Sequence, residues 1–199
     1  ASPSSSSTPA RRNFAAGPGS DLAFDSVPPE MGVELDMTNR ARRSWRLMRE
    51  AEQLDRATLE RIKFDMVYDE AGYVKRMLDT VRAIDPRGDK RLAEARRLFL
   101  SWDRSADNVG RGDAIALLVL KEFMSASYQH KVWPDAREEL AKAADHLARR
   151  FGRLDPPMSE VLRLRRGPGP HSVDLPLDGG SDTLRPSTTW ADCWVKTFA

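Results

Sequence analysis

The chain has 199 residues, of which 40% are hydrophobic and 31% charged, a composition typical of a folded protein with one good-sized core or two small ones. Its 32 basic and 30 acidic residues nearly cancel, and this balance argues against a nucleic-acid partner. The single cysteine, Cys193, excludes an internal disulfide bond, and no run of about 18 apolar residues indicates a membrane span.

Three regions follow from the distribution of residue types. Residues 1–35 are rich in proline, glycine and serine, which predicts an extended lead-in with turns. Residues 36–155 carry apolar residues at helical spacing and are expected to be a helical region. Residues 156–199 are expected to form a short helix, then a strand and a turn. Because the chain does not begin with Met and shows no signal-peptide pattern, we expect a fragment or a processed chain.

Three helices are predicted in the first part of the helical region, from apolar residues that recur at steps of three and four. Their expected bounds are, in order, Asp36 or Thr38 to about Leu54, Asp55 onwards, and about Glu70 to Ile84. The first helix places Trp45 and Met48 on an apolar side opposite a heavily charged one. We expect these three helices to form a small bundle.

Three more helices are predicted in the second part. The first of them ends near Trp102. The run that follows Asp113, "AIALLVLKEFM", is apolar nearly all round and predicts the most buried helix of the chain, with Asp113 as its N-cap. The last has Pro134 at its start and Gly152 as its C-cap.

The pattern changes after Pro156. The segment "MSEVLRLRRG" is expected to form one or two helical turns. The alternation of Val173, Leu175 and Leu177 predicts a strand that is broken by Pro176. The fold class predicted for this chain is therefore mainly α, with short β segments near the C-terminus.

The stretch "DLPLDGGSDTLR", Asp174 to Arg185, is the least ordinary in the chain. It lacks the G-x-x-x-x-G-K-[ST] spacing of a phosphate-binding loop. Its aspartates, including Asp178 and Asp182, fall at four-residue steps, whereas the first EF-hand calcium ligands alternate at positions one, three and five. We therefore predict a tight turn that uses the positive φ available to glycine.

The other reactive side chains predict no site. His130, His146 and His171 lack the partner four residues away that a helical metal site would show, and no Cys/His cluster has zinc spacing. The basic run 163–167 is interpreted as a solvated charged stretch in preference to a site for an acidic partner. Cys193 is expected to be inert. No cofactor and no metal site is predicted.

Four collinear segments resemble the later part of penicillin acylase-type enzymes. They are "PPEMGVELDMTNRARRSWRLM", "LFLSWDRSADNVGRGDAIALLVLKEF", "MSEVLRLRRG" and "DLPLDGGSDTLR". The family's version of the last segment looks like "LPLDGGPDTLR". The branch that the chain most resembles contains acyl-homoserine lactone acylases and aculeacin A-type lipopeptide acylases. The resemblance covers about residues 28–185 and implies a fragment of the large subunit.

The resemblance implies an N-terminal-nucleophile hydrolase of αββα fold, made as a precursor that cuts itself into a small and a large subunit. In such enzymes the serine that opens the large subunit attacks an amide carbonyl, and its own α-amino group, with a pKa near 8, serves as the base. No segment here matches the one that carries this serine. The chain is expected to supply helices packed around the catalytic sheets.

Two site residues are implied by the resemblance. If Pro9 matches the proline of the family's oxyanion motif, Ser6 stands where the oxyanion asparagine would be, and its hydroxyl is a shorter donor than an amide. The family's arginine near the acyl and oxyanion site corresponds to Arg40. The alternative for Arg40 is an exposed arginine on a helix surface.

Two functions follow from these expectations. The first is part of an acylase that hydrolyses the amide bond of acyl-homoserine lactones, lipopeptides or β-lactam antibiotics, with the rest of the large subunit and the small subunit as partners. The second is a catalytically inactive helical binding or scaffold protein derived from the family. The family implies a periplasmic or secreted protein and, in some members, a structural calcium whose ligands are not identifiable in this sequence.

Overall fold

The computed structural model describes residues 37–166 and 173–186. These residues contain seven helices and two strands: α1 (Asn39–Glu50), α2 (Arg56–Lys63), α3 (Gly72–Arg82), α4 (Lys90–Leu100), α5 (Asp113–Tyr128), α6 (Ala136–Phe151), α7 (Met158–Val161), β1 (Arg163–Arg166) and β2 (Val173–Pro176). The prediction of a mainly helical chain with short strands near the C-terminus is confirmed.

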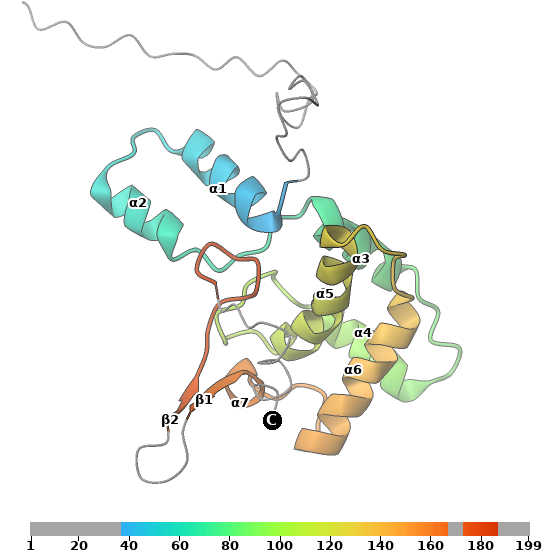
Figure 1. The fold of residues 1–199 in the computed structure, drawn as a ribbon. Coiled ribbons are helices and arrows are strands. Elements are labelled where there is room, and N and C mark those ends of the chain that lie inside the picture. Colours follow the sequence, from blue (N-terminus) through green and yellow to red (C-terminus); the bar gives the residue numbers. More distant parts are fainter. Residues whose placement is uncertain (1–36, 167–172, 187–199) are drawn as a thin grey trace, which may run out of the picture. The chain divides into compact units, whose positions relative to one another are not determined.

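Helix α5 is the central element of what we call the helical body, helices α3 to α7 (Figure 1). It packs against α3, α4, α6 and α7, and its residues Ile115, Val119 and Phe123 are fully buried. A helix that is apolar nearly all round is stable only with neighbours on most of its sides. The prediction that this segment is the most buried helix is therefore confirmed.

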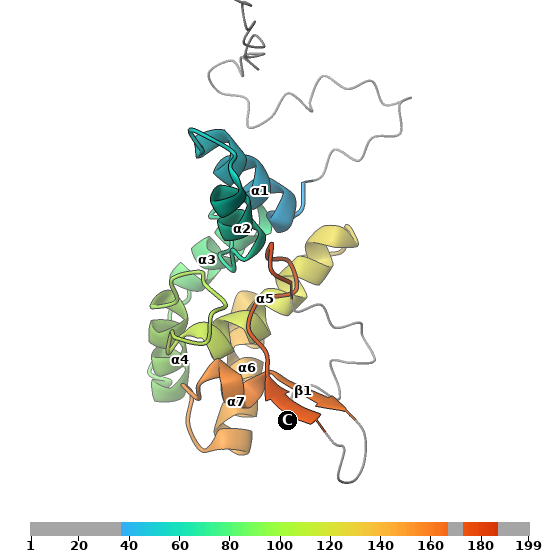
Figure 2. The ribbon, with the colours of Figure 1, turned by 90° about the vertical axis from the view of Figure 1, so that its left-hand side faces the viewer.

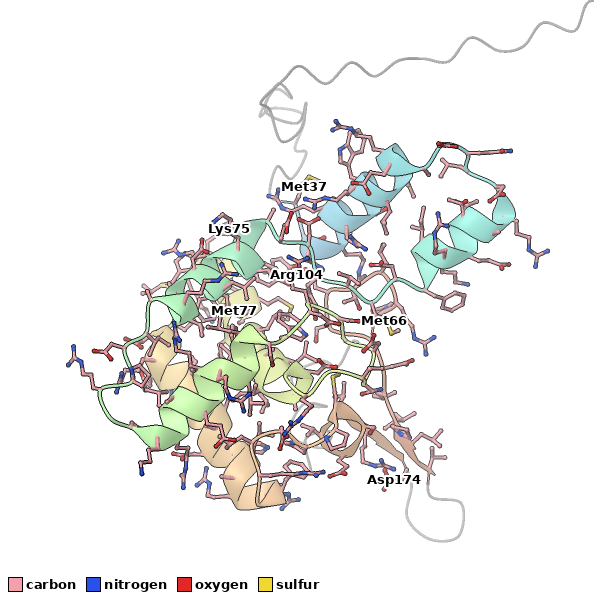
Figure 3. All side chains as sticks on the ribbon, turned by 180° about the vertical axis from the view of Figure 1, so that it is seen from behind. Met37, Met66, Lys75, Met77, Arg104 and Asp174 are labelled. Carbon is pink, nitrogen blue, oxygen red and sulfur yellow. The ribbon has the colours of Figure 1, made fainter. Side chains whose placement is uncertain are left out.

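The other long helices of the body are amphipathic. On α3, Met77 is fully buried while Lys75 is exposed and pairs with Asp79 on the helix surface (Figure 3). On α6, Leu140 and Leu147 are fully buried. Each such large side chain contributes about 1.5–3 kcal/mol when it leaves water. The helical body therefore has an apolar core to which every one of its helices contributes.

Side-chain caps determine where several helices begin. Thr38, Asp55, Asp89 and Asp135 each accept a hydrogen bond from a backbone N–H of the first turn of the following helix. For α1 and α2 these are caps that the sequence predicts. Helix α6 ends at the predicted C-cap, Gly152, whose φ of 69° lies in the left-handed region.

Two predicted helix starts are shifted by the packing and the caps. Asp113 is the first residue of α5, and Gly112 is the N-cap. Pro134 precedes α6 rather than starting it, because the carboxylate of Asp135 caps the helix. Position 112 requires a glycine, since a Cβ there would lie 2.4 Å from the carbonyl oxygen of Leu98. The start of α5 therefore rests directly on the end of α4.

The prediction that the first three helices form a bundle is wrong. Helix α3 packs against α4, α5 and α6, whereas α1 packs against α2. Trp45 and Met48, the expected apolar side of α1, are 40% and 44% exposed. The side of α1 that contacts other parts of the chain is polar, because Arg43 and Arg46 form ion pairs with carboxylates of the segment that follows α2.

After α7 the chain forms a two-stranded antiparallel ribbon of β1 and β2 (Figure 2). Leu164 lies opposite Leu175 in this ribbon. The predicted helical turn in "MSEVLRLRRG" is therefore right for α7 and wrong for the residues of β1. An ion pair of 2.5 Å between Arg163 and Asp174 joins the two strands. Strand β2 ends at Pro176, in agreement with the predicted break, because proline has no N–H to donate to a ladder.

Candidate functional site

The chain turns sharply after β2, in a segment that we call the motif loop, residues 178–186. Gly179 has a φ of 85°, so the predicted turn that needs a glycine is confirmed. Its N–H donates to the carbonyl oxygen of Ala106 at 2.7 Å. The second glycine has another role that the sequence did not indicate: a Cβ on Gly180 would lie 2.0 Å from the hydroxyl oxygen of Tyr68.

Asp182 is the centre of a buried polar cluster in the motif loop. Its carboxylate accepts hydrogen bonds from the backbone N–H groups of Asn39 at 2.8 Å and Arg40 at 3.3 Å. The hydroxyl of Tyr73 donates to the same carboxylate at 3.0 Å, and the hydroxyl of Tyr128 also donates to it. Asp182 therefore joins the start of α1, helix α3 and the end of α5.

These bonds complete the start of α1. The first four N–H groups of a helix have no partner within the helix. Here the first two donate to Asp182, and the next two donate to the side chain and the carbonyl oxygen of Thr38. The partial positive charge at the N-terminus of α1 and the negative charge of the Asp182 carboxylate also attract each other.

The side chain of Asn39 binds both the motif loop and the segment after α2. Its Nδ2 donates to the carbonyl oxygen of Asp182 at 2.8 Å, and its Oδ1 accepts from the N–H of Asp69 at 2.7 Å. Asn39 is buried, so removal of either bond would leave a polar group without water. One residue thus fixes α1 to both the motif loop and the segment after α2.

Arg40, the predicted site arginine, is bound to the motif loop. Its Nε donates to the carbonyl oxygen of Thr183 at 3.1 Å, and its Nη2 donates to that of Ser181 at 3.2 Å. The planar guanidinium matches two neighbouring acceptors in this way. The side chain is therefore not the unattached surface arginine of the alternative interpretation. Ser6, the other predicted site residue, lies outside the described residues.

Two further segments, 65–69 and 104–106, hold the motif loop from the other side. They run side by side, and one of the backbone hydrogen bonds that join them connects Ala106 to Met66 at 3.1 Å. Met66 and Arg104 of these segments are labelled in Figure 3. The motif loop forms backbone hydrogen bonds with both segments. Four parts of the chain that are distant in sequence thus meet at one place.

The electrostatics of the cluster favour holding an anion. Burial, and then the negative charge of Asp182, raises the pKa values of Tyr73 and Tyr128 above the usual range of a phenol. Burial also raises the pKa of Tyr68. All three phenols stay protonated at neutral pH, and those of Tyr73 and Tyr128 donate hydrogen bonds to Asp182. The hydroxyl groups of Tyr73 and Tyr128 thus stabilise the negative charge of the Asp182 carboxylate, and a protonated phenol does not serve as a base.

A small cavity lies beside the motif loop, lined by Tyr68 and Gly180 and by apolar residues of α5 and α7. Its volume of about 20 Å³ suffices for one water molecule. An acyl chain does not fit into that space.

Possible metal ligands are not clustered in the part of the chain that the structure describes. Within residues 37–166 and 173–186, no three or more His, Cys, Asp and Glu side chains are grouped so that they could hold a metal ion. Burial, and then the charges of Arg149 and Arg150, lowers the pKa of His146. His171 and Cys193 lie outside the described residues. Within the same two ranges, no helix has the length and apolar character needed to cross a bilayer.

Sequence reasoning found the motif loop and Arg40 but missed the cluster that joins them. Asn39 carried a weak signal, because it follows a predicted N-cap directly. Tyr73 and Tyr128 carried none, since each belongs to a helix whose apolar pattern explains its presence. Their shared contact with Asp182 is visible only in three dimensions.

The fold and the cluster define a helical protein in which the motif loop, with its two glycines, holds α1 and Arg40 in place through hydrogen bonds. A model of the penicillin amidase family matches residues 9–195. The chain therefore belongs to the penicillin amidase family, and at this level it is related to enzymes that hydrolyse amide bonds. Searches of curated proteins and of solved structures found no match.

Proposed function

We propose that the chain is part of an acylase that hydrolyses N-acylated compounds, with an N-terminal serine nucleophile carried by another part of the enzyme. The observation that carries this proposal is the family match over residues 9–195, which includes all four segments of the sequence resemblance. In this proposal the described residues hold α1 and Arg40 in place through hydrogen bonds to the motif loop, and another part of the enzyme performs the nucleophilic attack.

Within this proposal, Arg40 borders the acyl and oxyanion site. Its Nε and Nη2 are fixed by two backbone carbonyls, while its Nη1 makes no hydrogen bond within the described residues. A guanidinium held in this way presents its remaining donors with little loss of side-chain entropy. Ser6 takes the oxyanion position in the same proposal.

The preferred substrates are acyl-homoserine lactones and acylated lipopeptides, and β-lactam antibiotics are less favoured. This preference rests on the branch of the family that the four segments resemble. The enzyme is proposed to act in the periplasm or outside the cell, together with the remainder of the large subunit and the small subunit.

A second candidate is a helical binding or scaffold protein without activity. The apolar core of the helical body favours it, because most large apolar residues of α3 to α7 are covered without any added sheet. Such a protein would melt cooperatively as the isolated chain. The two candidates differ in what the complete gene product does to an acylated substrate.

The test compares this 199-residue chain with the complete product of its gene. Each is incubated with N-decanoyl-homoserine lactone, an acylated lipopeptide and penicillin V, and the released amine is measured. We expect no release from the chain alone and release from at least one substrate by the complete product. A complete product that folds and leaves all three substrates intact would contradict the acylase proposal and favour the scaffold protein.

The role of Arg40 is tested in the active product with Arg40→Lys. A lysine keeps the charge but cannot bind two carbonyls with a planar fork, so we expect kcat/KM to fall by about tenfold or more. Arg49→Lys, at an exposed position of the same helix, is the matched control and should stay within about twofold. Equal kcat/KM values for the two variants would show that Arg40 does not serve the reaction.

A further inference from the structure

Four hydrogen-bond donors from three helices converge on one point in the helical region. They are the N–H groups of Asn39 and Arg40 at the start of α1, the hydroxyl of Tyr73 on α3 and the hydroxyl of Tyr128 at the end of α5. We propose that these donors form a carboxylate-binding hole, that Asp182 is its built-in ligand, and that occupancy of the hole holds α1 on the helical body.

The donors are positioned by contacts other than those to Asp182. The rings of Tyr73 and Tyr128 pack edge to face with centroids 5.9 Å apart. Tyr73 is buried on α3, in the apolar core. At α1, Thr38 caps the helix, and the Oδ1 of Asn39 is bound to the segment after α2. Because these contacts do not involve Asp182, we expect the two tyrosines to keep their places when that side chain is shortened, so that an added carboxylate can bring the start of α1 back to them.

The hole fits a small carboxylate and no larger anion. Asp182 is 4% exposed, so the space around its carboxylate is filled by protein. Both carboxylate oxygens are used, one by Arg40 and the other by Asn39 and the two tyrosines. A halide can replace the oxygen that three donors share, but it leaves the N–H of Arg40 without an acceptor. Formate has the two oxygens and the size of the missing group.

The hole matters for α1 because this helix has few other attachments to the body. The side chains of Arg43 and Arg46 bind the segment that follows α2, and those of Asn39 and Arg40 bind the motif loop. Trp45 and Met48 are 40% and 44% exposed, so the apolar side of α1 is not buried in the core. Among the described residues, the hydrogen bonds to Asp182 link α1 to both α3 and α5, and the side chain of Arg42 adds a contact with Gly72 at the start of α3.

The test uses Asp182→Ala in the 199-residue chain and follows amide hydrogen exchange by mass spectrometry. We expect amides of α1 to exchange at least about tenfold faster than in the parent, while α5 keeps its protection. Addition of about 100 mM sodium formate should restore α1 to within about threefold of the parent. Sodium chloride at the same ionic strength should not.

Two further variants serve as controls. Asp178→Ala removes a half-buried partner of Arg185 from the same loop and should leave α1 protection unchanged, with or without formate. Tyr128→Phe combined with Asp182→Ala removes one donor and should weaken the formate effect.

Unchanged α1 protection in Asp182→Ala overturns the proposal, and so does equal recovery in formate and chloride. If Asp182→Ala does not fold alone, folding in formate but not in chloride supports the hole, and failure in both overturns it.

Discussion

Gly112→Ala is expected to destabilise the protein by about 3 kcal/mol or more. The added Cβ would lie 2.4 Å from the carbonyl oxygen of Leu98 and 3.0 Å from the backbone nitrogen of Trp102. Both atoms belong to the backbone at the end of α4, so neither moves without displacing that helix from α5. The free energy of unfolding, measured with urea, checks this expectation.

Gly152→Ala is the matched control for this experiment, because it is the same substitution at a site without a clash. Gly152 has a φ of 69°, and no atom lies within 4 Å of an added Cβ. The substitution at Gly152 therefore costs only the strain of a left-handed backbone at a residue with a side chain, about 1–2 kcal/mol. A loss at Gly112 no greater than that at Gly152 would show that α4 and α5 are not in close backbone contact.

Asp113→Asn is expected to change how stability depends on pH. Burial, and then the nearby charges of Asp103 and Asp107, raises the pKa of Asp113 to about 7, although the N–H of Gly110 favours the charged form. In the unfolded chain the pKa of this carboxyl has its ordinary value of 3.8, so the folded state binds the proton more tightly. The contribution of this bound proton to the stability of the folded protein is complete below pH 3.8 and is lost as pH rises through about 7.

For the parent protein, this carboxyl alone should lower the free energy of unfolding by about 2–3 kcal/mol between pH 5 and pH 8. Asparagine does not titrate, so the variant should lack that loss and be the more stable protein at pH 8. Urea unfolding at both pH values measures the difference. Asp103→Asn, on an exposed neighbour, should retain the loss; parallel pH profiles for the parent and Asp113→Asn would contradict the assignment.

The sequence allowed the helix ends to be predicted where one residue acts on its neighbours. Thr38 and Asp55 cap helices through N–H groups three residues away, and Gly152 ends α6 through its own φ. Such effects are local, so they can be inferred without the folded structure. The buried character of α5 was also predictable, because no polar side is present to face water.

The sequence could not predict which side of α1 faces the protein. The apolar side carries Trp45 and Met48, yet ion pairs of the opposite side decide the orientation. Nor could it predict the strand at Arg163–Arg166, because so short a segment takes its structure from pairing with β2. In both places a tertiary contact prevailed over the local pattern.

The polar cluster was beyond sequence reasoning for a similar reason. The partners of Asp182 lie 54, 109 and 143 residues away along the chain. Arg40 was proposed from the family resemblance and the motif loop from its glycines. Nothing in either segment indicated that one binds the other.

The bond between Asn39 and Asp182 also has a consequence for the order of events during synthesis. It closes a span of 143 residues, so the start of α1 cannot acquire this partner before nearly the whole described chain has left the ribosome. Helices α3 to α6 are closer neighbours along the chain, and we expect them to associate earlier. The first helix of the described chain to be made is thus the last to be fixed in place.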